Sequence, residues 1–195
     1  NIVLARADIV RGIRELVARL HAHDVHVSIQ IVGGAAIALT LNAERIATRD
    51  VDALFAPTGG VVAAAREVAQ SNGWPHDWLN DSAALFLPNG FGRALEWETI
   101  YRDESVTVQV ASAYMLLAMK LFAAERRYTR EADDLSTLLK ACGITDVAEA
   151  ERCLDDFYPG DGLSARTVAL VEDLLSSTAT ATTSTTVDSG EFASE

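Results

Sequence analysis

The sequence predicts an α/β protein of the α+β kind, in which a small mixed sheet flanked by helices is followed by a C-terminal helical bundle. Segments with strand periodicity occur only in the first 110 residues, helical segments lie between them, and the periodicity is helical from residue 111 onward. A chain of 195 residues is long enough for one catalytic lobe with a helical extension. We therefore expect a lobe at 1–110, a helical region at 111–176 and a disordered tail at 177–195.

Helices are expected where apolar residues recur every three or four positions, and strands where apolar and polar residues alternate. In the first lobe, the expected helices span residues 5–22, 35–41 and 61–72, and the expected strands span 25–32, 50–55, 95–101 and 106–110. Together the strands predict a sheet of four or five strands. The polar segment 102–105 joins the last two strands into a hairpin.

After residue 111, helical periodicity continues through Phe122 and returns in segments 132–139, 146–157 and 163–176. The remaining residues are rich in Thr, Ser and Ala. Such a composition buries too little apolar surface to order a chain, so a disordered tail is expected.

The charge of the chain narrows the function classes. The net charge of -12 excludes a protein that coats nucleic acid, because neutralising phosphates requires clustered Lys and Arg. Residues 151–195 carry -7 of this charge, so a local basic site is compatible with the less acidic part of the chain that precedes them. We expect no membrane span and no signal peptide, and therefore a cytoplasmic protein. Cys142 and Cys153 match no metal-ligand spacing and receive no chemical role.

The segment from Ile31 to Phe55 contains the most informative residues. Asp50 and Asp52 are two apart on an expected strand, so their side chains leave the same face about 6–7 Å apart at the backbone. Carboxylate oxygens at this spacing suit one divalent cation or a pair of them, as phosphoryl and nucleotidyl transfer require. The alternative is a solvated strand edge.

Upstream of these carboxylates, Gly33 and Gly34 stand where a strand ends and a helix begins. Glycines at such a junction let backbone N–H groups approach a polyphosphate, helped by the partial positive charge of the helix start. A simple turn is the alternative. The two features in this order are far less common than either alone.

Taken together, these residues resemble the signature of the DNA polymerase β-like nucleotidyltransferase superfamily, a glycine pair followed by Asp-x-Asp. More narrowly, the chain resembles the AbiEii/MenT-type toxin nucleotidyltransferases, which have Arg and Thr before Asp-x-Asp, as Arg45 and Thr48 stand here. A second matching block, 111–139, has a Lys on a helix and then Arg and Asp before a Leu. The matching residues in this block are Lys120, Arg127, Arg130, Asp133 and Asp134.

The resemblance implies a role for each matching residue. Gly33, Gly34 and Thr48 would bind the triphosphate of a nucleoside triphosphate (NTP), and Asp50 and Asp52 would hold magnesium, or manganese in its place. Lys120 would contact the phosphates or the leaving pyrophosphate. Asp134, or less favourably Asp133, would be the family's later acidic residue. Many superfamily members have a third carboxylate on a later strand, where this chain offers Gln109 or, on the preceding strand, Glu96 and Glu98.

The implied activity is transfer of a nucleoside monophosphate from an NTP to an acceptor hydroxyl. The family suggests the 3′ end of tRNA as acceptor and a cognate antitoxin as partner. Two alternatives stay open. One is transfer to a small molecule or a protein side chain, and the other is a catalytically silent fold used for binding.

Other polar and aromatic groups have simpler interpretations. His21, His23 and His26 are interpreted as capping and surface groups. Trp74, Trp78 and Trp97 are interpreted as core or loop anchors. Three arginines form the best candidate for a basic patch. The alternative interpretation is that they form ion pairs with neighbouring carboxylates. These arginines are Arg126, Arg127 and Arg130, and the carboxylates are Glu125, Glu131 and Asp133.

Overall fold

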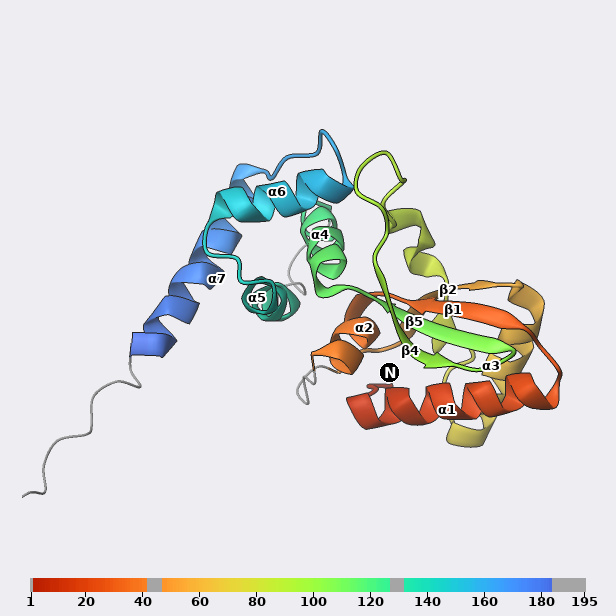
Figure 1. Cartoon of the computed structure of the whole chain (residues 1–195). Coiled ribbons are helices and arrows are strands. Elements are labelled where there is room, and N and C mark those ends of the chain that lie inside the picture. The colour runs from red at the N-terminus through yellow and green to blue at the C-terminus, as the bar shows by residue number, and fades with distance from the viewer. Residues whose placement is uncertain (1, 42–46, 127–131, 184–195) are drawn as a thin grey trace, which may run out of the picture.

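The computed structural model describes residues 2–41, 47–126 and 132–183. Within these ranges the chain forms a mixed sheet, two helices beside it and a cluster of helices at one end (Figure 1). The helices are α1 (Arg6–Ala22), α2 (Gly33–Thr40), α3 (Thr58–Asn72), the 3-10 helix η1 (Ser82–Phe86), α4 (Ala113–Ala124), α5 (Ala132–Ala141), α6 (Val147–Phe157) and α7 (Ala165–Thr183). The strands are β1 (Val27–Ile31), β2 (Val51–Ala56), β3 (Leu79–Asn80), β4 (Trp97–Arg102) and β5 (Val106–Ala111).

The sheet has the strand order β3-β2-β1-β5-β4. Strand β1 pairs parallel to β5 and antiparallel to β2, while β3 is parallel to β2 and β4 is antiparallel to β5. The β4–β5 hairpin forms where it was predicted, and the five-stranded mixed sheet confirms the expected α+β class. Strand β3 was not expected, because two residues are too few to show an alternating pattern.

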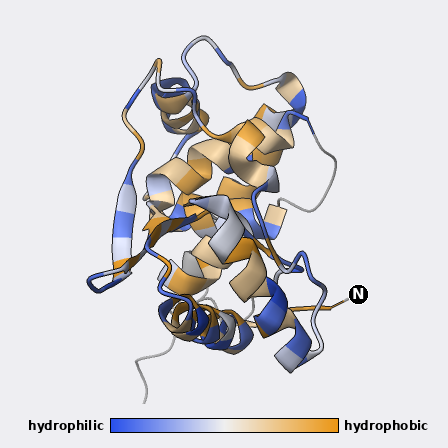
Figure 2. Cartoon of the chain, turned by 90° about the vertical axis from the view of Figure 1, so that its right-hand side faces the viewer, coloured by the Kyte–Doolittle hydropathy of each residue, from blue (hydrophilic) through white to orange (hydrophobic). Residues whose placement is uncertain are grey.

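The two faces of the sheet differ in polarity, as the alternation along each strand requires. One face is apolar and buried, and helices α1 and α3 lie on that side (Figures 1 and 2). It is formed by Val27, Ile29, Ile31, Val51, Ala53, Val106, Val108 and Val110. The opposite face, called the open face below, is half-buried or exposed. It is formed by Ser28, Gln30, Asp52, Leu54, Thr107 and Gln109.

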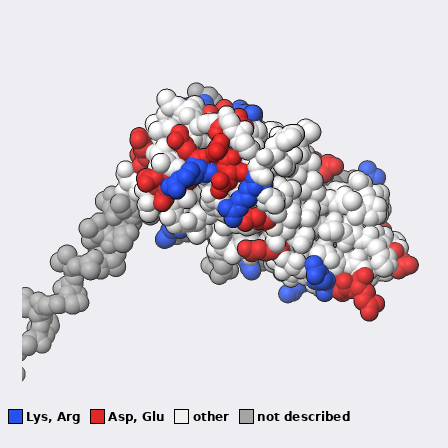
Figure 3. All heavy atoms as spheres, turned by 45° about the horizontal axis from the view of Figure 1, so that its top comes forward, with Lys and Arg blue, Asp and Glu red and all other residues white. Residues whose placement is uncertain are grey.

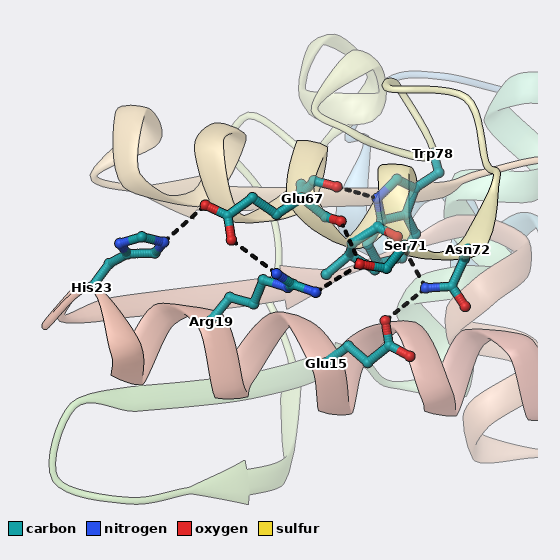
Figure 4. Close-up of polar contacts among 9 residues, drawn as sticks. Glu15, Arg19, His23, Glu67, Ser71, Asn72 and Trp78 are labelled. Carbon is teal, nitrogen blue, oxygen red and sulfur yellow. Dashed lines mark hydrogen bonds and ion pairs between the residues drawn. The ribbon is translucent and has the colours of Figure 1, made fainter.

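Helices α1 and α3 are held together by polar contacts along one side (Figure 4). Arg19 pairs with the Glu67 carboxylate at 3.0 Å and donates to the Ser71 hydroxyl at 2.8 Å. The Glu67 carboxylate also meets His23 at 2.9 Å. Hydrogen bonds from Arg19 and His23 lower the pKa of Glu67, so this carboxylate stays charged between the helices.

The C-terminal helices pack on one another at the end of the sheet from which α4 emerges (Figure 1). Ser112 caps α4 by accepting a hydrogen bond from the Met115 N–H at 3.1 Å. The far end of α4 is tied to α7, because Arg166 donates to the Ala124 carbonyl at 2.7 Å. No helix among the described residues is long and apolar enough to cross a membrane.

The predicted start of the tail at residue 177 is wrong, because α7 continues to Thr183. The Ser176 and Ser177 hydroxyls donate to the carbonyls of Glu172 and Asp173 at 2.9 Å each, so polar side chains satisfy part of the helix backbone here. Ala and Thr also continue a helix at little free-energy cost. The prediction for residues 184–195 lies outside the described residues.

Tight packing of α1 on a tryptophan pair gives a stability prediction. A Cβ on Gly12 would lie 2.8 Å from the Trp74 ring and 2.9 Å from the buried Trp78 ring. Gly12→Ala is therefore expected to lower the free energy of unfolding by about 1–2 kcal/mol, since overpacking outweighs the gain in helix propensity. Gly59→Ala, with no atom within 4 Å of the new Cβ, is expected to cause no loss. Urea unfolding of both variants measures this, and equal stability would contradict the packing of α1.

Candidate functional site

Segments far apart in the sequence meet at one end of the sheet. Strands β1 and β5 run parallel, so the helices that follow them, α2 and α4, begin at the same end. Strand β2 is antiparallel to β1 and therefore starts there. A cavity of about 580 Å³ opens at this end. It is lined by Val3, Gly33, Gly34, Ala47, Thr48, Arg49, Asp50, Asp52, Ala83, Phe86, Leu116, Met119, Lys120, Ala123, Arg126, Asp133 and Asp134.

The two predicted metal-binding carboxylates both line this cavity. Asp50 directly precedes β2, and Asp52 is its second residue, on the open face. The Asn80 side chain donates to a carboxylate oxygen of Asp50 at 3.1 Å. The Thr48 hydroxyl donates to the Asp50 backbone carbonyl at 2.9 Å. The Asp50 carboxylate and backbone are therefore both oriented by neighbouring polar groups.

The predicted phosphate-binding glycines face these residues across the cavity. Gly33 has a φ of +67°, in the left-handed region that favours glycine. A Cβ there would lie 3.2 Å from an Asp52 carboxylate oxygen, and a Cβ on Gly34 would lie 3.3 Å from the Thr48 hydroxyl. A side chain at either position would therefore press on Asp52 or Thr48, and the glycines allow the start of α2 to approach these residues closely.

Lys120 reaches the cavity from α4, a helix whose other side chains are nearly all apolar and buried. Its ammonium lies 2.7 Å from the Asp134 carboxylate on α5, and the two side chains are only 16% and 17% exposed. A buried ammonium needs such a partner, because an unpaired charge would cost several kcal/mol. Lys120 therefore both pairs with a carboxylate and lines the cavity.

None of the candidates for a third carboxylate lines the cavity. Gln109 accepts a hydrogen bond from Gln30 at 3.0 Å on the open face. Glu96 pairs with Arg93 at 2.9 Å, and Glu98 is exposed on β4. The additional acidic groups at the cavity are Asp133 and Asp134.

Among the described residues, no three His, Cys, Asp or Glu side chains are placed to hold a metal ion together. The carboxylate pair nevertheless fits magnesium, which proteins usually bind through one or two carboxylates, waters and substrate phosphates. The cavity of about 580 Å³ that the pair lines would have to accommodate these waters and phosphates. Asp50 and Asp52 are thus the residues that could hold the ion.

Three of the arginines named from the sequence, Arg45, Arg127 and Arg130, lie outside the described residues. The three histidines meet three different carboxylates, which supports their interpretation as surface groups. These pairs are His21 with Asp103 at 2.7 Å, His23 with Glu67 at 2.9 Å and His26 with Asp24 at 3.8 Å.

The remaining aromatic and thiol groups are structural. Trp78 is fully buried, donates to the Ala65 carbonyl at 2.9 Å and packs edge-on against Trp74. Burial raises the pKa of the Cys142 thiol to about 11 and that of Cys153 further, so neither is a thiolate at neutral pH.

Sequence reasoning missed several residues in or beside the cavity. Asn80, which contacts Asp50, is the second residue of the two-residue strand β3 and had no pattern to identify it. Phe86 belongs to η1, whose five residues are too few to show a helical pattern. Met119 and Ala123 also line the cavity. The signal that could have identified them is their helical spacing from Lys120, which places them on the same side of α4.

The distribution of charged side chains on the surface agrees with the sequence-based expectation that the protein does not coat nucleic acid. On the face shown in Figure 3, acidic and basic side chains lie interspersed over the helical region. Helix α6 carries the acidic residues Glu149, Glu151 and Asp155 close in sequence to Arg152. This face therefore presents no broad basic surface among the described residues.

A matched pair of glycines tests the shape of the site. Gly33 and Gly143 both have a positive φ, +67° and +65°, but a Cβ on Gly143 meets nothing within 4 Å. Each substitution to Ala should lower the free energy of unfolding by about 1 kcal/mol. Only Gly33→Ala is expected to weaken binding of inorganic tripolyphosphate with magnesium, by about tenfold, as measured by calorimetry. Equal affinity of both variants for tripolyphosphate would place the phosphate site elsewhere.

Comparison with known proteins adds no relative: no model of a protein family matches the chain, and no curated protein and no solved structure is significantly similar to it.

Proposed function

We propose that the protein is a magnesium-dependent nucleotidyltransferase that transfers a nucleoside monophosphate from an NTP to an acceptor hydroxyl. The observation that carries the proposal is the convergence of three segments on one cavity. These segments contribute the carboxylates Asp50 and Asp52, the glycines Gly33 and Gly34, and the cation Lys120. A pair of carboxylates facing a phosphate-sized space and a lysine is an arrangement suited to phosphoryl chemistry.

In the proposed reaction, an oxygen of the acceptor attacks the α-phosphorus of the NTP. The bond from the α-phosphorus to the bridging oxygen breaks, pyrophosphate leaves and the hydroxyl proton is released. The backbone at Gly33 and Gly34 would bind the triphosphate at the start of α2, with the Thr48 hydroxyl beside it. Lys120 would neutralise charge that develops on the departing pyrophosphate, with Asp134 positioning its ammonium.

Asp50 and Asp52 would hold the divalent cation. When bound, the cation lowers the charge on the attacked phosphate and makes the acceptor hydroxyl more acidic. Asn80 would keep the Asp50 carboxylate in the orientation that this role requires.

Resemblance to the AbiEii/MenT-type toxins supports a more specific form of the proposal. In this form the acceptor is the 3′ end of tRNA, and the protein is the toxin of a toxin–antitoxin pair. The proposed nucleotidyltransferase fold rests on the same resemblance and agrees with the mixed sheet. Incubation with each α-labelled NTP, magnesium and total RNA tests the proposal, since label would appear in tRNA, in a small molecule or in protein.

The carboxylates provide the first test of chemistry. Asp50→Asn and Asp52→Asn each keep the shape of the side chain and remove the charge that a cation requires. We expect each to lower transfer at saturating magnesium at least a hundredfold, or about 2.7 kcal/mol of transition-state stabilisation. Asp81→Asn is the control, because Asp81 is exposed close to the site but does not line the cavity. Full transfer by either of the first two variants would refute the metal assignment.

Lys120 provides a second test, of geometry at constant charge. Lys120→Arg keeps the positive charge but replaces a compact ammonium with a larger planar group in a space where the lysine is 16% exposed. Transfer at subsaturating NTP should fall about tenfold or more, corresponding to about 1.4 kcal/mol. Lys140→Arg, on the exposed side of α5, should transfer at the wild-type rate. Wild-type activity of Lys120→Arg would remove Lys120 from the site.

A further inference from the structure

The lining of the cavity has two chemically different parts. The part described above carries the carboxylates, the glycines and Lys120. The other part, called the apolar end here, comes from η1, the last turns of α4 and the turn that follows α4, and consists of Ala83, Phe86, Met119, Ala123 and Arg126. Positions 119, 123 and 126 are four and three residues apart, which is the spacing of one helix face. Among the described lining residues of the apolar end, Arg126 is the only polar one.

Arg126 is held flat against an aromatic stack. Its guanidinium carbon lies 3.6 Å from the centre of the Phe122 ring, and Phe122 in turn stacks on Tyr158 with ring centres 4.1 Å apart and planes 9° apart. Arg126 also donates to the Phe122 carbonyl at 3.3 Å. One face of the guanidinium is therefore covered by Phe122, while the residue remains exposed and lines the cavity.

The stack is anchored to the opposite wall of the apolar end. The Tyr158 hydroxyl donates to the Phe86 carbonyl at 2.6 Å, which joins the end of α6 to η1. Burial raises the pKa of Tyr158 well above its usual value, so the hydroxyl remains a donor at neutral pH. Tyr158, Phe122 and Arg126 therefore form a fixed platform, called the Arg126 platform below.

Ion pairing with the described residues does not account for Arg126. No described carboxylate lies within ion-pair distance of its guanidinium. The neighbouring Glu125, which the sequence offered as a partner, instead accepts hydrogen bonds from the Ser164 N–H at 3.1 Å and the Ser164 hydroxyl at 3.2 Å. Among the described residues, Phe122 alone contacts the guanidinium, which therefore presents its charge and its other face to the cavity.

We propose that the Arg126 platform binds the base of the NTP, with the nucleobase stacked on the Arg126 guanidinium and the apolar lining beside it. This inference rests on the proposed function and assigns the base to one end of that site. A planar guanidinium stacks well on π systems, and base stacking of this kind contributes about 1–3 kcal/mol. A cavity of about 580 Å³ has the size of a typical small-ligand site. Stacking accepts every base, so the four NTPs should bind within about tenfold of one another.

The test uses two ligands that share a triphosphate, of which only the first also carries a ribose and a base. The first is 2-aminopurine riboside triphosphate with magnesium, whose base fluorescence falls on stacking, and the second is inorganic tripolyphosphate with magnesium. Arg126→Ala and Arg126→Met are compared with Arg11→Ala. Arg11 also stacks on an aromatic ring, that of Trp74 at 5.3 Å, but lies outside the cavity.

Wild-type protein and Arg11→Ala are expected to quench the 2-aminopurine fluorescence and to bind the nucleotide equally well. Both Arg126 variants should bind it at least tenfold more weakly and lose the quenching, while tripolyphosphate affinity stays within about twofold. Unchanged nucleotide affinity in the Arg126 variants would overturn the base site and leave the proposed function standing. An equal loss for both ligands would mean that Arg126 binds phosphate and would also overturn it. Wild-type protein that binds neither ligand would contradict the proposed function itself.

Discussion

The candidate site depends on the antiparallel pairing of β2 with β1. The Val32 N–H donates to the Asp52 carbonyl at 2.9 Å where β1 ends, and this bond places the start of β2 beside the start of α2. Gly33 is the next residue and has a positive φ, and because it lacks a Cβ no side chain presses on Asp52. A shift of one residue in the register would turn both aspartates toward the buried face, where no charge is tolerated.

The second half of the site comes from the parallel pairing of β1 with β5. It directs α4 from the same end of the sheet, so that Lys120 lines the same cavity as the residues of β2. Asp134 then holds the ammonium in a place where water is largely excluded. Opposite charges within one poorly hydrated space interact strongly, which suits a site that must stabilise phosphate charge. The same helix continues into the apolar end, so one element serves both ends of the cavity.

Much of this could be predicted from the sequence, because the signals are local. Alternation and helical spacing predicted β1, β2, β4, β5 and the helices, and the two-residue spacing of Asp50 and Asp52 predicted a shared face. Contacts that depend on tertiary packing could not be predicted. Asn80 reaches Asp50 only because β3 pairs with β2, and Phe122 stacks on Tyr158 only because α6 packs against α4. The end of α7 was predicted too early. The Thr, Ser and Ala content indicates that little apolar surface is buried there, but it does not show the hydrogen bonds that the serine hydroxyls make to the helix backbone.

The central claim is that the carboxylate pair and the glycines bind a metal-bound triphosphate. Anomalous diffraction from a crystal grown with manganese and a non-hydrolysable NTP analogue tests this claim most directly. The account predicts a manganese ion about 2.2 Å from oxygens of both Asp50 and Asp52, with the triphosphate beside Gly33 and Gly34. Manganese bound elsewhere, with the analogue outside the cavity and no ion at the two aspartates, would contradict it.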